Sequence, residues 1–160
     1  MSEPVTIKRG TEIELGIESL AYGGMGLARI ENFVIFVKYA IPGQKVLARI
    51  YKKRKGYAEA QVLETLVESP SAVDVCCKHY WICSKIQSLS YDEQIKEKSS
   101  QVEDAFVRLG GFLNFKLDKV QKANLIYHYR NKMEFTFSPN RWVLESEPEG
   151  VDKSFALGLH

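Results

Sequence analysis

Apolar and polar residues alternate along most of residues 7–67, and a period of two is typical of half-buried β-strands. In the clearest example, Ile13, Leu15 and Ile17 alternate with polar residues, and only Gly16 interrupts the pattern. The pattern, with a continuous apolar run at residues 33–37, predicts strands at residues 11–17, 27–30, 33–37, 46–51 and 57–63. Short turn-forming segments separate these strands, so we expect a five-stranded OB-like barrel.

Three glycines fall within the segment Gly23-Gly24-Met25-Gly26, between the first two predicted strands. Because glycine has no Cβ, its backbone can adopt positive φ or lie very close to another group. A glycine-rich bend between strands lets a small barrel turn a corner. We therefore expect a corner here, and a structural bend by itself explains the glycines equally well.

The composition changes at the polar segment Glu68-Ser69-Pro70-Ser71-Ala72, which contains a proline. Segments of this kind commonly separate domains. We therefore expect residues 1–68 to form the barrel and residues 69–160 to begin a second domain. The predicted fold class is mainly β, with an α+β second part.

The second part combines one helical pattern with further strands. Ser90 and Glu93 match a capping box, apolar residues follow at helical spacing, and Gly110-Gly111 supplies a stop. We therefore expect a helix from Tyr91 to Leu109. Later alternation predicts a strand with one buried face, a turn, and two more strands, at Lys132–Phe137, Ser138–Asn140, Arg141–Leu144 and Ser154–Leu159. Since the sequence stops within a strand pattern, we expect the natural protein to continue.

Composition narrows the class of protein. The net charge of +2 is too small to indicate nucleic-acid binding by itself. The sequence has no run of about eighteen apolar residues and no signal-peptide pattern. Its three cysteines do not make a secreted disulfide framework. We expect a cytoplasmic monomer that does not bind membranes.

A basic run, Lys52-Lys53-Arg54-Lys55, lies at a predicted hairpin tip between Tyr51 and Tyr57. On an OB-like barrel, positive side chains follow phosphates and aromatic rings stack on bases. The run therefore indicates contact with RNA or DNA, although a solvated hairpin tip explains it equally well.

A second polar group, Arg130, Asn131 and Lys132, lies at the start of a predicted strand. Arginine can bind a phosphate through two hydrogen bonds, and asparagine can pair with a base edge. An ion-paired strand end is the simpler interpretation of these residues.

Cys77 and Cys83 are close in sequence, with Cys76 beside the first and His79 between them. Closely spaced cysteines indicate a metal or iron–sulfur site. A cluster needs four thiolates, however, and the sequence has three cysteines. Buried, inert cysteines are therefore the simpler interpretation.

Several segments together resemble a known family. The first part is similar to a TRAM domain, on the segments Gly23–Arg29, Ile41-Pro42-Gly43, the basic run and Tyr57-Ala58-Glu59-Ala60. The second part resembles the central domain of the RNA uracil-5-methyltransferases, which methylate carbon 5 of uridine in ribosomal or transfer RNA. That resemblance is carried by Cys77–Cys83, Leu89–Gln94 with Lys98, Gln101–Ala105, Tyr129–Lys132 and Phe155–His160.

The resemblance implies an RNA-binding barrel, a central domain that helps to hold the RNA, and a following domain that binds S-adenosylmethionine. That last domain would supply the cysteine nucleophile and the general base. We therefore expect an N-terminal fragment with no catalytic residue of its own. The RNA-binding candidates are Arg29, Lys52, Lys53, Arg54, Lys55, Tyr57, Arg130, Asn131 and Lys132. The alternative is a stand-alone RNA-binding adaptor protein without catalysis.

The cysteine segment departs from this family. Many members place a third cysteine in a Cys-Gly-Gly-Cys step and bind a four-iron cluster. Here Cys83 is followed by Ser84-Lys85-Ile86. We therefore treat Cys77 and Cys83 as degenerate iron–sulfur ligands and predict no intact cluster in this chain.

Overall fold

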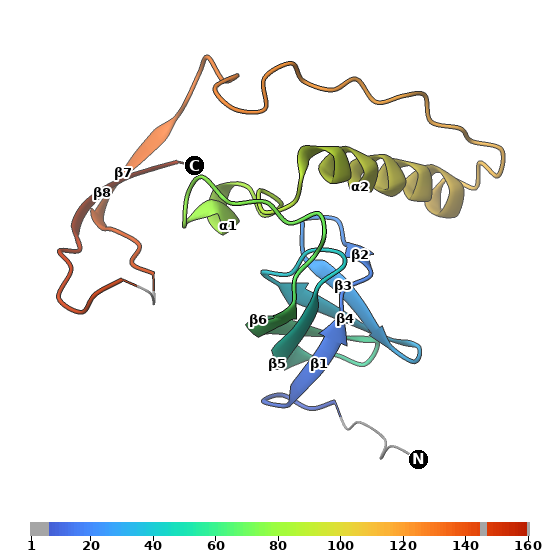
Figure 1. Ribbon diagram of the computed structural model, residues 1–160, viewed down its shortest axis with the longest axis horizontal. Helices are drawn as coiled ribbons and strands as arrows, with labels where there is room; N and C mark the ends of the chain where they lie inside the picture. Colours follow the sequence, from blue (N-terminus) through green and yellow to red (C-terminus); the bar gives the residue numbers. More distant parts are fainter. Residues whose placement is uncertain (1–6, 145–146, 160) are drawn as a thin grey trace. The chain divides into compact units, whose positions relative to one another are not determined.

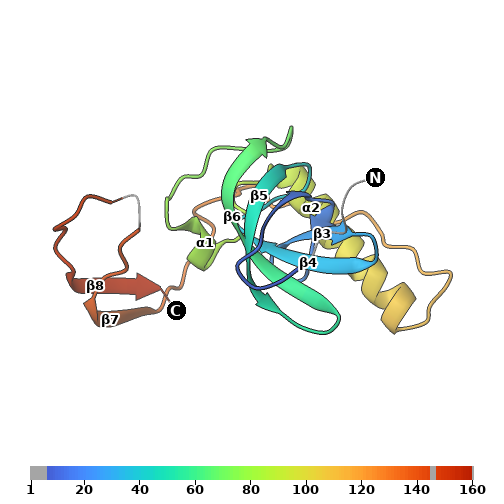
Figure 2. The same ribbon diagram turned by 90° about the horizontal axis from the view of Figure 1, so that it is seen from below.

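Six strands in the first part of the chain form one sheet. The computed structural model describes residues 7–144 and 147–159, without the side chains of Cys83 and Leu159. The strands are β1 (Glu12–Gly16), β2 (Ser19–Leu20), β3 (Gly26–Ile30), β4 (Phe33–Lys38), β5 (Lys45–Lys53) and β6 (Tyr57–Val67). Their order is β1-β5-β6-β4-β3-β2, with β4 parallel to β6 and the other neighbours antiparallel. Figures 1 and 2 show the strands curling around a common interior.

The interior of the curled sheet is filled by the apolar positions of the alternation. Ile35, Val37, Val46 and Ile50 have no exposed surface. Each fully buried side chain of this size contributes about 1.5–3 kcal/mol relative to an exposed one. The sequence pattern predicted β1, β3, β4, β5 and β6, and the structure confirms a strand-rich first part. It adds β2, whose two residues are too short to give a periodic signal.

The predicted bend at the glycines is confirmed. Gly23 and Gly24 have φ of +91° and +83°, a region that residues with a Cβ rarely adopt. Gly26 has a different reason to lack a side chain. A Cβ there would lie 2.9 Å from Ile17 Cγ2 and 3.0 Å from Ala40 Cβ. The glycines therefore close a tight corner and allow its end to pack into the core.

The helical segment begins where the sequence predicted it and ends differently. After a short helix α1 (Tyr80–Cys83), α2 (Tyr91–Asp104) begins at Tyr91. The predicted capping box is wrong in detail, because the Ser90 side chain makes no capping hydrogen bond. The last predicted turn is a wider π-helical turn, η1 (Ala105–Leu109).

Helix α2 lies across the end of the sheet beside β2 (Figure 1). The backbone N–H of Leu20 donates to Glu97 Oε2 at 3.0 Å. The Leu20 carbonyl accepts from Gln101 Nε2 at 3.2 Å. Glu97 and Gln101 are four residues apart and share one face of the helix. Their side chains therefore take the place of a neighbouring strand along the exposed edge of β2.

Beneath these contacts, Leu20 packs with Ile41 and Leu89 in a second, smaller apolar cluster. Leu89 also forms an isolated bridge with Ala72. This cluster attaches the segment after β6 to the curled sheet.

Residues Ala123–His160 form a compact unit separate from Met1–Lys122. Within it, β7 (Phe135–Asn140) pairs antiparallel with β8 (Ser154–Leu159). The predicted turn at Ser138-Pro139-Asn140 and the strand at Arg141–Leu144 are wrong, because β7 runs through the proline and residues 141–144 are not in a strand. Each strand of a two-stranded ribbon has one unpaired edge, where a proline loses no hydrogen bond.

The predicted buried face of this unit is also wrong. Phe135 is 51% exposed and Phe137 is 73% exposed. Two strands alone have no second layer to cover an apolar face.

In the part of the chain that the structure describes, no helix is both long and apolar enough to cross a bilayer.

Candidate nucleic-acid interface

Aromatic side chains gather on the outer face of β4 and β6. Parallel pairing sets Phe36 opposite Glu59, and Val34 opposite Tyr57. The rings of Phe36 and Tyr57 meet edge to face, with centroids 5.6 Å apart and an interplanar angle of 74°. Both residues are half-buried, so part of each ring is open to solvent. These rings provide a surface on which a base can stack.

A shift of register in β5 adds two polar side chains to this face. Lys52 is paired with Glu59 and Ile50 with Ala60, so Tyr51 is the extra residue between them. The Tyr51 hydroxyl donates to Glu59 Oε2 at 2.9 Å. Lys52 Nζ donates to Glu59 Oε1 at 2.5 Å. The bulge therefore brings Tyr51 and Lys52 onto the same carboxylate.

The pKa values of this group follow from its contacts. The hydrogen bond from Lys52 lowers the pKa of Glu59 below its ordinary value of 4.5, and the Tyr51 hydrogen bond adds to the effect. Burial raises the pKa of Tyr51, and the nearby Glu59 carboxylate raises it further. Glu59 is therefore ionised and Tyr51 is neutral at pH 7.

Lys38 completes the face from β4. Its Nζ lies 4.8 Å from the centroid of the Tyr51 ring. Its charge also helps to lower the pKa of Glu59. Lys38, Phe36 and Tyr51 were not among the residues predicted for a site. Phe36 lies within the continuous apolar run Phe33–Val37, so no alternation marked it as an outer-face residue.

The four residues of the basic run lie in different surroundings. Lys52 is held on the outer face, whereas Lys53 is paired with the buried Ala58. Lys53 Nζ instead lies 5.8 Å from the ring centroid of Phe33, which packs against the core. Arg54 closes the hairpin through a backbone hydrogen bond to Tyr57 O at 2.8 Å. The side chains of Arg54 and Lys55 are exposed at the tip.

Arg29 lies on β3, paired with Val34 of β4. Its guanidinium forms an ion pair with Glu18. Both side chains are about half exposed, at 48% and 47%. An exposed pair of this kind contributes about 0–1 kcal/mol, so Arg29 can exchange Glu18 for another anion at little cost.

Arg130, Asn131 and Lys132 belong to the second unit, in a segment outside any strand. All three are exposed. Lys132 forms an ion pair with Glu134 at 2.9 Å. The strand begins later than predicted, at Phe135, so these residues precede it rather than form its start.

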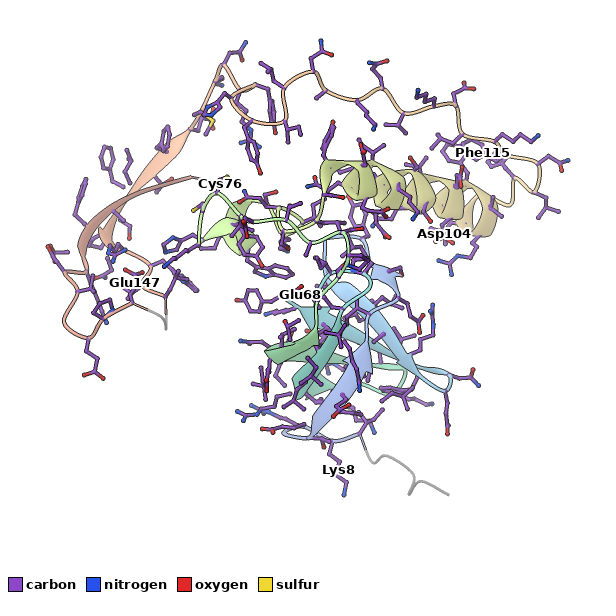
Figure 3. The ribbon with its side chains drawn as sticks, viewed as in Figure 1. Lys8, Glu68, Cys76, Asp104, Phe115 and Glu147 are labelled. Carbon is purple, nitrogen blue, oxygen red and sulfur yellow. The ribbon has the colours of Figure 1, made fainter. Side chains whose placement is uncertain are left out.

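The cysteines lie between the end of β6 and α2. Cys76 is on the loop before α1, and Glu68 lies just after the end of β6 (Figure 3). Cys76 Sγ lies 3.4 Å from Gln87 Oε1. Cys77 Sγ accepts from the backbone N–H of His79 at 3.4 Å. Both thiols are free and exposed, which corrects the expectation of buried cysteines for this pair. Among the described residues no three metal-binding side chains come together.

Known proteins are similar in sequence to this chain over most of its length. Residues 7–63 match the TRAM domain. The chain is 35% identical over 154 residues to an uncharacterized RNA methyltransferase of Porphyromonas gingivalis, a match that covers 90% of this chain and 33% of that protein. It is 36% identical over 146 residues to another from Bacteroides thetaiotaomicron, covering 88% of this chain and 32% of that protein.

Residues 7–63 are therefore similar to the TRAM domain, and most of the chain is similar to proteins named RNA methyltransferases. A third relative, an uncharacterized RNA methyltransferase of Caldanaerobacter subterraneus, is 33% identical over 154 residues, covering 95% of this chain and 32% of that protein. The chain therefore spans about a third of the length of these relatives. A conserved protein of Methanococcus maripaludis, known from a solution structure, is 33% identical with a TM-score of 0.36, covering 38% of this chain and 87% of that one.

Proposed function

We propose that the outer face of β4, β5 and β6 binds single-stranded RNA, and that this chain is the RNA-binding part of a longer RNA methyltransferase. The observation that carries this proposal is the mixed surface on that face. Phe36 and Tyr57 offer partly exposed rings beside Lys38, and the exposed Arg54 and Lys55 continue the positive charge at the hairpin tip. Aromatic rings and cations on one surface are the elements of sequence-tolerant single-strand binding.

The candidate residues have different roles in this proposal. Tyr57 stacks on a base, and Lys53, Arg54 and Lys55 contact phosphates. Lys52 contributes only when it leaves Glu59, because the two form an ion pair. Arg29 extends the surface along β3, whereas Arg130, Asn131 and Lys132 provide a separate contact from the second unit.

We assign the finer features of the family to this chain as part of the same proposal. Residues 1–68 form an OB-like RNA-binding domain, and residues 69–160 begin the central domain. The longer protein uses S-adenosylmethionine to methylate carbon 5 of uracil in ribosomal or transfer RNA, in the cytoplasm. Support comes from the TRAM match and from relatives named RNA methyltransferases.

The chemistry of that reaction requires a nucleophile and a base. A thiolate must add to carbon 6 of uracil so that carbon 5 can attack the methyl group, and a base must then remove the proton from carbon 5. The target base must also leave its stack. We propose that the residues responsible, and the binding site for S-adenosylmethionine, lie in the remaining two thirds of the family's length.

RNA affinity as a function of salt tests the binding face. The variant with Lys52, Lys53, Arg54 and Lys55 all changed to alanine should bind a single-stranded RNA more weakly. Its salt slope should be shallower by about 0.7 for each phosphate that the variant no longer neutralises. The matched control removes the same charge elsewhere in the first unit, at Lys96, Lys116, Lys119 and Lys122. Equal slopes for the two variants would remove the hairpin tip from the RNA site.

Tritium release tests the reaction. Methylation at carbon 5 expels the hydrogen of that carbon, so RNA carrying tritium at carbon 5 of uridine should release it to water. We expect release by the longer protein with S-adenosylmethionine, and none by residues 1–160. A longer protein that binds RNA without methylating it would favour the adaptor function.

Iron analysis tests the cysteine segment. We propose that Cys77 and Cys83 hold no intact four-iron cluster in this chain. Stoichiometric iron and sulfide after anaerobic purification of residues 1–160 would contradict the proposal.

A further inference from the structure

An open cleft lies between the glycine corner, the segment after α1, and helix α2, all within the first unit. Its volume is about 420 Å³, within the range of about 300–1,000 Å³ that small-molecule sites occupy. The lining includes Tyr22 and Gly24 from the corner, Lys85 from the segment after α1, and Lys98 and Gln101 from α2. None of these residues belongs to the outer face described above.

Tyr22 is held out over this cleft by a well-defined turn. It is 95% exposed, more than any other large apolar or aromatic residue described as exposed. The Ala21 N–H donates to Met25 O at 2.8 Å, and the Gly24 N–H donates to Ala21 O at 3.0 Å. These bonds close the corner on both sides of Tyr22. The ring is therefore presented to solvent by an ordered backbone, with no packing role of its own.

Gly24 packs this turn closely against the segment after α1, which forms a second wall of the cleft. A Cβ at Gly24 would lie 2.9 Å from Lys85 Cβ. The corner thus touches the backbone segment that carries Lys85. On the α2 side, the Glu97 carboxylate and the Gln101 amide bind Leu20, immediately before the corner. The three walls are held together by contacts that do not use the Tyr22 ring.

Two cations at the cleft are available to a ligand. Lys85 and Lys98 are both exposed. Within residues 7–144 and 147–159, neither forms an ion pair or side-chain hydrogen bond, whereas Lys96 on the same helix pairs with Glu93. The single carboxylate in the lining, Glu97, already accepts the Leu20 N–H. The cleft therefore combines a free aromatic ring with an excess of positive charge.

We propose that this cleft is a second RNA contact, which binds one nucleotide of a single strand. Tyr22 stacks on the base, and Lys85 and Lys98 contact the flanking phosphates. The inference rests on the RNA-binding function proposed above and adds a site at the junction of the curled sheet with α2. A preformed stacking ring costs little entropy on binding, because the turn is ordered before the RNA arrives.

Substitutions at the corner test the stacking contact. Tyr22→Ala should weaken binding of a short single-stranded RNA by about 5- to 150-fold, the range that follows from about 1–3 kcal/mol for loss of one base–aromatic stack. Tyr22→Phe should bind nearly as the wild type, because the ring is kept. Neither change threatens folding, since the side chain is almost fully exposed.

The lysines have a charge-matched control. The double variant Lys85→Ala/Lys98→Ala should reduce the salt slope by about 1.4, for two single-strand phosphate contacts. The control Lys45→Ala/Lys96→Ala removes the same charge from residues outside the cleft, which pair with Glu14 and Glu93. Cross-linking of 5-iodouridine RNA, followed by peptide mapping, should label the peptide that contains Tyr22.

The outcomes separate this site from the general RNA-binding function. Loss of affinity in Tyr22→Ala with retention in Tyr22→Phe supports the cleft. Wild-type affinity in Tyr22→Ala, while the hairpin-tip variant is weakened, overturns the cleft and leaves the proposed function intact. Failure of the unmodified chain to bind RNA overturns both. Equal binding of a single-stranded DNA of the same sequence would overturn the assignment of the ligand as RNA.

Discussion

Glu59 is the residue on which the outer face of the sheet depends. The register shift in β5 directs both Tyr51 and Lys52 to its carboxylate, and Lys38 lies close enough to influence its pKa. The side chain of Glu59 is 19% exposed, compared with 40% for Lys52. The carboxylate is therefore partly shielded and neutralises one cation of the basic run.

Replacing Glu59 with glutamine should give a pH-dependent loss of stability. The folded-state pKa of Glu59 lies below its ordinary value of 4.5, so the stabilisation is complete above that value and is lost as pH falls through the folded-state pKa. At pH 7 we expect a loss of about 0.5–1.5 kcal/mol, since Lys52 is partly solvated.

Urea unfolding of the wild type and Glu59→Gln from pH 7 to pH 3 measures this effect. The two midpoints should converge in acid. A difference that stays constant across this range would show that the Glu59 charge does not stabilise the fold. Glu14→Gln is a suitable control, because Glu14 pairs with Lys45 at a more exposed site, where its side chain is 58% exposed.

Two strand glycines, Gly26 and Gly16, should respond in opposite ways to alanine. A Cβ at Gly26 would meet Ile17 and Ala40 at 2.9–3.0 Å, so Gly26→Ala should destabilise the protein by about 1–3 kcal/mol through overpacking. Gly16 has nothing within 4 Å of its Cβ position. Gly16→Ala should be neutral or stabilising by up to about 1 kcal/mol. Thermal unfolding of both variants measures the contrast, and equal losses would contradict it.

At the scale of elements, the central feature is helix α2 on the edge of β2. Strand edges expose unpaired N–H and C=O groups that invite pairing with other chains. Glu97 and Gln101 supply an acceptor and a donor at the right spacing, one helical turn apart. A helix thereby completes the sheet without adding a strand.

Removing these two side chains should open that edge. Glu97→Ala and Gln101→Ala should each lower the free energy of unfolding by about 0.5–1.5 kcal/mol. If either change already detaches the helix from β2, the double variant should lose less than the sum of the two single losses. Hydrogen exchange at the Leu20 amide gives a local measurement, and we expect its protection to fall in Glu97→Ala. Lys96→Ala is the control, since its exposed pair with Glu93 is worth little. Unchanged protection of Leu20 would contradict the edge role.

At the scale of the whole chain, the two units differ in how they bury apolar residues. The curled sheet encloses a continuous core. In the β7–β8 unit, the ring centroids of Phe137 and Phe155 lie 6.0 Å apart, yet the two residues remain 73% and 66% exposed. A two-stranded ribbon with uncovered apolar faces is marginally stable by itself.

Backbone amides should therefore exchange hydrogen at different rates in the two units. Amides of β5 and β6 should exchange only through global unfolding, whereas those of β7 and β8 should exchange at least about 100-fold faster. Mass spectrometry of peptides from the two regions measures the ratio. Comparable protection in both regions would show that the β7–β8 unit is stabilised in a way that its exposed side chains do not explain.

The sequence by itself determined the local features. Alternation and short apolar runs predicted the strands of the curled sheet other than β2, because one face of each strand packs into the core. Glycines predicted the corner, because residues with a Cβ rarely adopt the positive φ found at Gly23 and Gly24. The capping-box pattern of Ser90 and Glu93 predicted the start of α2 at Tyr91, although the Ser90 side chain makes no capping hydrogen bond.

Only the tertiary structure decided what depends on partners distant in sequence. The register shift at Tyr51 places Lys52, rather than Lys53, opposite Glu59, and the alternation within β5 does not show where such a bulge occurs. The strand alternation at Phe135 and Phe137 predicted a buried face, but burial requires a second layer that β7 and β8 do not have. The cleft beneath Tyr22 joins residues that are distant in the sequence, from the corner to α2. Its walls meet because Leu20 needs hydrogen-bond partners, and α2 supplies them.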